Sequence, residues 1–126
     1  MAQIVVKSIG PLYRQEIEGG VHRWAADEPK SSGGQDAGPT PYQLLLSAVG
    51  SCMSITAQMY AARKQWPLEG VETAVEGRNR EAGYEITLSM RFSGPLTPEQ
   101  HARLAEIAGR CPVKRTLAGA VTFTVI

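Results

Sequence analysis

The sequence has little of several features that mark particular classes of protein. Its 126 residues include only two cysteines, and charged residues make up 20% of the chain. The net charge is +1, so the overall charge favours neither nucleic acid nor an anionic membrane as a partner. The N-terminus lacks the basic region, long apolar region and cleavage site of a secretory signal peptide. We therefore expect a cytoplasmic protein, in which a persistent structural disulfide is rare.

Charge is also absent from one long internal run. No Asp, Glu, Lys or Arg occurs between Tyr42 and Ala62, and this length could cross a bilayer. However, the run contains two glutamines, three serines and a threonine. Such polar side chains favour a buried helix of a soluble protein over a membrane span.

Histidine and glycine patterns exclude several kinds of site. The chain has only His22 and His101, and together with two distant cysteines they match no zinc pattern. The glycines at 33, 34 and 38 fit neither a P-loop nor a dinucleotide fingerprint. The sequence thus predicts no metal and no cofactor.

The hydrophobic pattern predicts an α+β fold in a single domain, residues 1–126. Alternation and turn signals predict strands, whereas apolar residues three and four apart predict helices. The expected order is βββ-α-ββ-α(α)-β: strands 3–9, 13–18 and 21–26, helix 41–65, strands 71–78 and 84–92, helix 98–111, a short helical turn 112–117, and strand 121–126.

The first helix is predicted to be long and buried on most sides. Thr40 can cap it, and Pro41 suits its first position, where a missing N–H costs nothing. Its predicted inward stripe is Leu45, Val49, Cys52, Thr56 and Met59, while Leu44, Ala48 and Ile55 cover the neighbouring face. One small domain would not usually bury so much apolar surface alone, so we expect an obligate dimer.

The second helix also has clear signals. Thr97, Pro98 and Gln100 form a capping-box pattern at its start. Its apolar stripe is Leu104, Ile107, Ala108 and Cys111.

The two cysteines admit two interpretations. Each alone is most simply a small core residue, because free cysteine is usually buried. Together they could form a redox pair, in which one thiolate attacks and the other resolves the product as a disulfide. Cys111 precedes Pro112, where a new helix can begin, and a helix N-terminus is expected to lower the pKa of a thiol. The two sulfurs, those of Cys52 and Cys111, can meet if the second helix packs on the first.

Several segments resemble the OsmC-like family. They are residues 33–52, which end in Ser-Ala-Val-Gly-Ser-Cys, residues 96–100, residues 108–117 and residues 22–29. The resemblance spans essentially the whole chain. It implies an intertwined homodimer with two central helices back to back and sheets completed by strands of both subunits.

The resemblance also implies thiol peroxidase activity. Cys52 occupies the position of the peroxidatic cysteine, which attacks an organic hydroperoxide, and Cys111 that of the resolving cysteine. A small dithiol, such as a dihydrolipoyl group, would reduce the resulting disulfide.

The chain departs from the peroxidase pattern at one point. The family's peroxidases hold the thiolate with an arginine, and a glutamate at the start of the cysteine helix holds that arginine. The matching residues here, Tyr42 and Gln43, are not carboxylates, and the arginine could be Arg14 or Arg23. We expect activation of the thiol to be weaker as a result.

Two functions therefore remain open. One is a cysteine-dependent hydroperoxide reductase that acts in oxidative-stress defence. The alternative is a non-catalytic binding or redox-sensing protein that uses an apolar pocket between subunits. Peroxide-dependent consumption of a dithiol distinguishes them.

Overall fold

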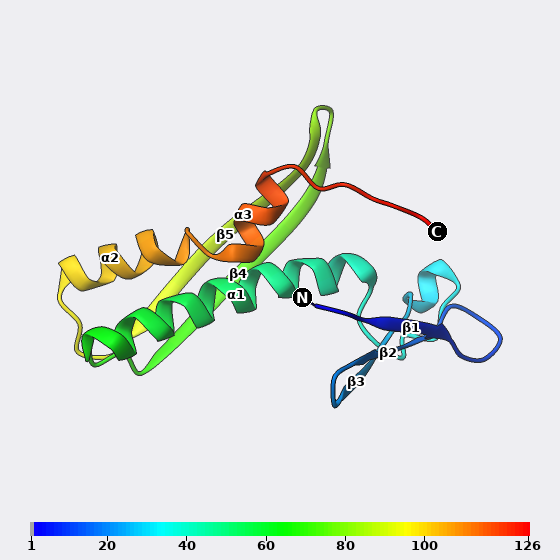
Figure 1. Cartoon of the computed structure of the whole chain (residues 1–126), viewed down its shortest axis with the longest axis horizontal. Coiled ribbons are helices and arrows are strands. Elements are labelled where there is room, and N and C mark those ends of the chain that lie inside the picture. Colours follow the sequence, from blue (N-terminus) through cyan, green and yellow to red (C-terminus); the bar gives the residue numbers. More distant parts are fainter. Residues whose placement is uncertain (1) are drawn as a thin grey trace. The chain divides into compact units, whose positions relative to one another are not determined.

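The computed structural model describes residues 2–126 and confirms the α+β class and the order of the elements up to the last helix (Figure 1). The described chain divides into two compact units, one ending at Leu45 and the other comprising Leu46–Ile126. In order, the elements are β1 (Val5–Ser8), β2 (Gln15–Gly19), β3 (His22–Ala26), the 3-10 turn η1 (Lys30–Ser32), α1 (Pro41–Lys64), β4 (Gly70–Arg80), β5 (Gly83–Ser93), α2 (Pro98–Ala108) and α3 (Pro112–Ala118).

The N-terminal unit is built on the predicted three-stranded meander. Strands β1, β2 and β3 pair antiparallel in sequence order. The turn between β2 and β3 follows Gly19, and Gly20 adopts a φ of +58°, which glycine tolerates better than other residues. Ile17 and Ala26 are the buried apolar residues of this sheet.

A buried carboxylate organises the loop that leads to α1. Asp27 is only 2% exposed, and its side chain accepts backbone N–H bonds from Glu28 (2.8 Å), Gln35 (3.3 Å) and Ala37 (3.1 Å). Burial alone would raise the pKa of Asp27. The three N–H bonds and the charge of Arg14 outweigh burial, so the pKa lies below its ordinary value.

We expect Asp27→Asn to lower the melting temperature by about 5 °C at pH 6, because a neutral amide satisfies these N–H groups less well. A carboxyl with a depressed folded pKa stabilises the fold above its unfolded pKa, and this contribution is lost as the pH falls through the folded value. The difference in melting temperature between wild type and variant should therefore shrink below a pH of about 3.8. Thermal unfolding against pH measures it. Glu28→Gln is the control, and a gap constant with pH would contradict the assignment.

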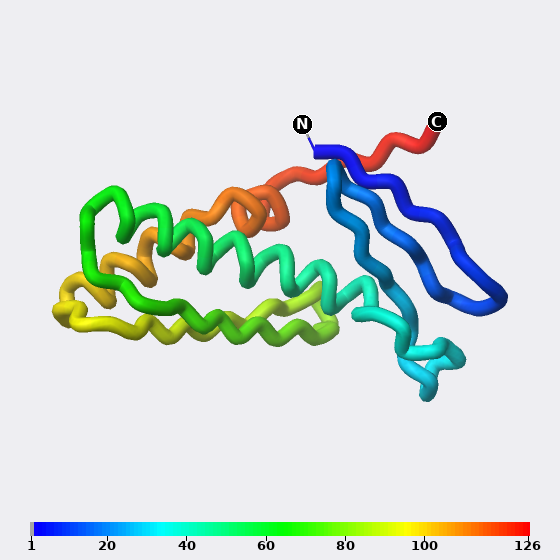
Figure 2. Tube along the Cα trace, turned by 90° about the horizontal axis from the view of Figure 1, so that it is seen from below, coloured from blue at the N-terminus to red at the C-terminus, as the bar shows by residue number. Residues whose placement is uncertain are grey.

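The C-terminal unit packs its helices on one face of a hairpin (Figure 2). Strands β4 and β5 are antiparallel, and alternate residues of both face the helices. α1 crosses β4 closely, since a Cβ at Gly50 would lie 2.9 Å from Val75 Cγ2. Ser54 and Thr73 share a hydroxyl–hydroxyl bond of 2.8 Å at the same crossing.

The core lies between α1, α2 and the hairpin. Its buried members are Val49, Met53, Ala57, Tyr60, Ala61, Leu104, Ala108 and Cys111. Strand and helix residues such as Leu88, Phe92 and Ile107 pack against them. The capping box of Thr97 and Gln100 at the start of α2 is present as predicted.

The buried face of α1 differs from the prediction. Met59 was expected to face inward and Ile55 to be covered, but they are 68% and 53% exposed in the single chain. Met53, Ala57 and Tyr60 are buried instead. The sequence misleads here because apolar and small residues surround the whole helix, so hydrophobicity alone does not identify the face that β4 covers.

The predicted last strand is not formed. Residues 121–126 pair with no other strand within the described chain. Phe123 and Val125 are 89% and 95% exposed. The alternating pattern of these residues is typical of a strand, but a strand needs a neighbour to satisfy its backbone groups.

Candidate functional site

The fold brings the two thiols together inside the C-terminal unit. Cys52 lies in the middle of α1 and is half-buried, whereas Cys111 joins α2 to α3 and is fully buried. Both are free thiols, Cys52 packs against the core cluster that contains Cys111, and Cys52 is close enough to raise the pKa of Cys111. The packing of α2 on α1 therefore brings together two cysteines that are 59 positions apart in the sequence (111 − 52). Of the two, only Cys52 is partly open to solvent.

The expectation of a lowered pKa for Cys111 is wrong, because the pKa of this thiol is raised. Burial raises the pKa of the Cys111 thiol, and its hydrogen bond with Cys52 and the charge of that sulfur raise it further. The N–H of Lys114, 3.4 Å from Sγ, and the Lys114 charge act in the opposite direction without prevailing. At neutral pH Cys111 is thus a protonated thiol.

Small and polar groups surround Cys52. Gly50, two residues before it, is where Val75 of β4 packs closely on α1, and the Cys52 carbonyl accepts a 2.7 Å bond from Thr56 Oγ1. Cys52 also packs against the buried core that contains Cys111. Cys52 is therefore the more exposed of the two residues, since Cys111 is fully buried.

An apolar hollow lies in the same unit, lined by neighbours of the two cysteines and by neither cysteine itself. Its volume is about 200 Å³, and its lining is Val49, Tyr84, Ile86, Leu88, Lys114, Leu117 and Ala118. Val49 is one helical turn from Cys52, and Lys114 is the residue whose N–H contacts Cys111. The hollow can accept an apolar group of modest size.

A hydrogen-bonded tyrosine joins α1 to α2. The Tyr60 hydroxyl accepts a 3.1 Å bond from Arg103 Nε, and Arg103 pairs with Glu106 at 3.1 Å. This bond, followed by the charges of Arg103, Lys64 and Arg63, lowers the pKa of Tyr60. The network fixes the packing of α2 on α1, which in turn places Cys111 beside Cys52. Sequence reasoning missed it because the partners are 43 residues apart (103 − 60).

Gln43 has a structural role in the helix start. Its Oε1 accepts the Thr40 N–H at 2.9 Å, and its own N–H donates to Thr40 Oγ1 at 3.2 Å. This is a capping box. The sequence contains its signal, a threonine three residues before a glutamine. The neighbouring Tyr42 is 57% exposed.

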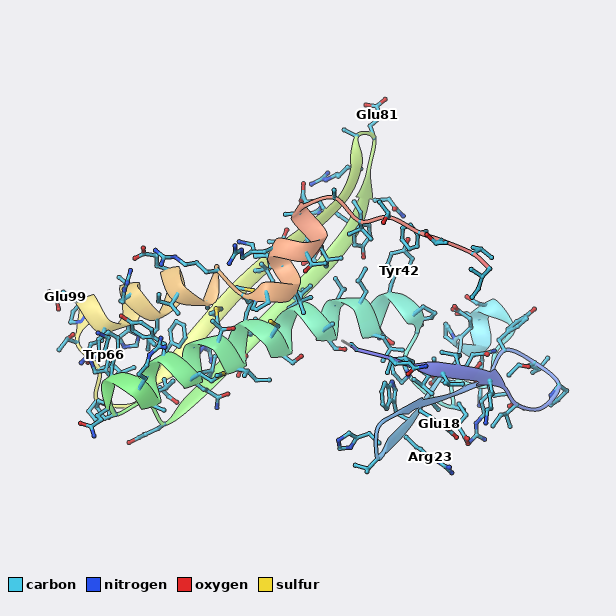
Figure 3. The ribbon with its side chains drawn as sticks, viewed as in Figure 1. Glu18, Arg23, Tyr42, Trp66, Glu81 and Glu99 are labelled. Atoms are coloured by element: carbon cyan, nitrogen blue, oxygen red, sulfur yellow. The ribbon has the colours of Figure 1, made fainter. Side chains whose placement is uncertain are left out.

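The two candidate arginines lie in the N-terminal unit. Arg23 pairs with Glu18 at 3.4 Å across neighbouring strands (Figure 3). Arg14 directly precedes β2, and its charge helps to lower the pKa of Asp27. Both arginines line a surface hollow of about 220 Å³ with Glu16, Trp24 and Ala25. Asp27 is thus a buried carboxylate under the influence of the Arg14 charge.

Metal ligands do not gather anywhere in residues 2–126. Within this range no group of three or more His, Cys, Asp or Glu side chains could hold a metal ion.

Comparison with known proteins places the chain among OsmC-like folds. Residues 33–126 match the sequence model of the OsmC-like protein family. No significant match is found among curated proteins. Among solved structures, an OsmC-like protein from Mycoplasma pneumoniae is 23% identical, with a TM-score of 0.76, over 94% of this chain and 88% of the other.

Two further similar structures are named as organic hydroperoxide resistance proteins. The Legionella pneumophila protein is 19% identical, with a TM-score of 0.68, over 94% of this chain and 90% of the other. OhrB of Bacillus subtilis is 20% identical, with a TM-score of 0.65, over 94% and 91%. Identities this low establish a shared fold, and the sequence match extends over 94 of 126 residues (126 − 33 + 1). The chain belongs to the OsmC-like protein family.

Proposed function

We propose that the protein is a cysteine-dependent reductase of organic hydroperoxides. The observation that carries this proposal is the pair of free thiols, half-buried Cys52 and fully buried Cys111, in a unit whose apolar hollow is lined by Val49 and Lys114. The names of the similar Legionella and Bacillus proteins support the same activity. An apolar hollow favours an alkyl hydroperoxide over the polar hydrogen peroxide.

The first step is attack by Cys52. Its thiolate attacks one oxygen of the hydroperoxide, the O–O bond breaks, and Cys52 becomes a sulfenic acid. The other oxygen leaves as an alkoxide, which takes a proton to give the alcohol. The hydroperoxide is thereby reduced by two electrons.

Cys111 completes the cycle. Its buried, protonated thiol stays unreactive until a sulfenic acid forms beside it. The Cys111 sulfur then bonds to that of Cys52, and the hydroxyl leaves with the Cys111 proton as water. A small dithiol or a lipoyl-type reductant restores both thiols by exchange and is itself oxidised to a disulfide.

The direct test is an assay of peroxide-dependent dithiol oxidation. We expect dithiothreitol or dihydrolipoamide to be consumed when an alkyl hydroperoxide is present. If neither dithiol is consumed, the protein is not a peroxidase, and the alternative of a binding or redox-sensing protein stands. That alternative has one specific support, because Gln43 caps the helix where the peroxidases have a glutamate.

We expect Gln43→Glu to raise the rate of Cys52 alkylation at pH 7 about threefold or more. A glutamate keeps the capping box and adds a carboxylate that can pair with an arginine, as the family resemblance implies for the peroxidases. Alkylation by iodoacetamide, followed by mass spectrometry, measures the rate. Adding Arg14→Lys or Arg23→Lys to Q43E should cancel the gain for whichever arginine is used. An unchanged or lower rate in Q43E would contradict the proposed support by an arginine.

The second proposal concerns assembly. Ile55 and Met59 expose an uncharged face of α1, and residues 121–126 expose the side chains of an unpaired strand pattern. We propose that a second copy covers both in an intertwined homodimer, located in the cytoplasm. Burial of these apolar groups stabilises such a dimer.

We expect sedimentation to show a dimer at micromolar concentration, and Ile55→Asp to shift it mainly to monomer. A charge placed in a buried apolar interface has no partner there. Glu81→Gln, at the exposed tip of the β4–β5 hairpin, is the control and should leave the dimer intact. A stable wild-type monomer at this concentration would contradict the proposal.

A further inference from the structure

The start of α3 depends on the sulfur of Cys111. This residue occupies the N-cap position, and its Sγ accepts the N–H of Lys114 at 3.4 Å. Pro112 at the first helical position has no N–H to contribute. The sulfur is therefore the side-chain acceptor that satisfies an N–H of the first turn, which the helix itself leaves unpaired.

Little else holds α3 in place. It is seven residues long, and none of its residues is fully buried. Val113 packs partly against the core, and Lys114 Nζ bonds the Gly109 carbonyl at 3.2 Å. Leu117 is 42% exposed. So short a helix is not stable on its own in water, which means that its few contacts with the rest of the unit decide whether it forms.

The same helix forms one wall of the apolar hollow. Lys114, Leu117 and Ala118 line it from α3. Val49 of α1 and the β5 residues line the opposite side. If α3 loosens, this wall opens.

Disulfide formation acts directly on the cap. In a disulfide the sulfurs are about 2.05 Å apart, well inside the distance of a hydrogen-bonded pair of thiols. The two sulfurs must therefore approach each other, and any movement of the Cys111 sulfur displaces the acceptor of the Lys114 N–H. Cys111 itself is fully buried in the core, whereas no residue of the adjoining α3 is buried. Of the two, α3 therefore has the weaker contacts and is the part that we expect to shift.

We propose that joining Cys52 to Cys111 uncaps α3 and opens the wall of the apolar hollow that α3 forms. With both thiols reduced, the capped α3 holds its wall of the hollow in place. After oxidation the loosened α3 lets the alcohol leave and lets a dithiol reach the buried disulfide. The two electrons and two protons lost by the thiols pass to the hydroperoxide, which yields an alcohol and water. That a hydroperoxide is the oxidant in the cell rests on the proposed function, whereas the movement of α3 requires only that the disulfide forms.

Hydrogen exchange of the full chain tests this with an oxidant other than peroxide. Diamide joins the two thiols as a disulfide and is itself reduced to the hydrazine, so no peroxidase activity is needed. We expect backbone amides of residues 113–118 to exchange roughly fivefold faster in the disulfide form than in the reduced form, as loss of a cap implies. Residues 98–108 of α2 serve as the internal reference and should exchange at the same rate in both.

Two variants separate the disulfide from other effects of the oxidant. Cys52→Ser keeps the Cys111 cap and cannot form the bond, so diamide should not change exchange in α3. Cys111→Ser keeps an N-cap oxygen and should give equal exchange with and without diamide.

The outcomes are distinct. Unchanged exchange of 113–118 in protein whose mass shows the disulfide would overturn the proposal, as would failure of diamide to form the disulfide. If diamide loosens α3 but an alkyl hydroperoxide produces no disulfide, the opening of α3 stands and the peroxidase assignment fails.

Discussion

Cys52→Ser should abolish peroxide-dependent consumption of a dithiol, with a loss of roughly a thousandfold or more. The serine hydroxyl is similar in size but is not ionised at neutral pH, so nothing is left to attack the O–O bond. Dithiol oxidation followed with increasing concentrations of an alkyl hydroperoxide measures the effect.

The control for this variant is Ser51→Ala on the exposed side of α1. Ser51 donates only to the Ala48 carbonyl, at 3.3 Å, so its loss should leave turnover near wild type. Substantial activity in Cys52→Ser would show that another group reacts with the peroxide.

Cys111→Ser should permit one round of peroxide reduction and then stall. Cys52 can still form a sulfenic acid, but no thiol beside it can resolve the product. Steady turnover should fall by about a hundredfold or more, while a dimedone-type reagent labels Cys52. A serine can still accept the Lys114 N–H, so the start of α3 is preserved.

A specific result would contradict the prediction for Cys111→Ser. Normal steady turnover without a dimedone adduct would mean that an external thiol resolves Cys52 directly. Prolonged exposure to peroxide should also drive Cys52 of this variant to the sulfinic acid, which intact mass detects.

Local patterns predicted most of the fold. The alternation at 84–92 predicts β5, and Thr97-Pro98 with Gln100 predicts the start of α2, because each signal lies within a few residues. The capping box of Thr40 and Gln43 has the same spacing, yet Gln43 was considered only as a possible partner of an arginine.

Features that depend on distant residues could not be predicted in this way. The face of α1 that is buried depends on where β4 crosses it, and the helix sequence is apolar on several sides. The bond from Arg103 to Tyr60 joins different helices, and burial of Asp27 depends on loop amides at 35 and 37. Residues 121–126 have the composition of a strand, but nothing in the described chain pairs with them.

The pKa of Cys111 illustrates the same limit. Its position before Pro112 correctly places it at a helix start, from which a lowered pKa was expected. Complete burial outweighs the single N–H bond at 3.4 Å, and the pKa is raised instead. Burial is a property of the folded core that the local sequence does not contain.

Intact-mass measurement after one equivalent of an alkyl hydroperoxide tests the central role of the cysteine pair most directly. The expected product is the wild-type chain with two protons lost, a decrease of about 2 Da, which reverses on addition of dihydrolipoamide. Peptide mapping should locate the bond between Cys52 and Cys111. An unchanged mass, or addition of oxygen at Cys52 without loss of the Cys111 thiol, would contradict a resolving disulfide between them.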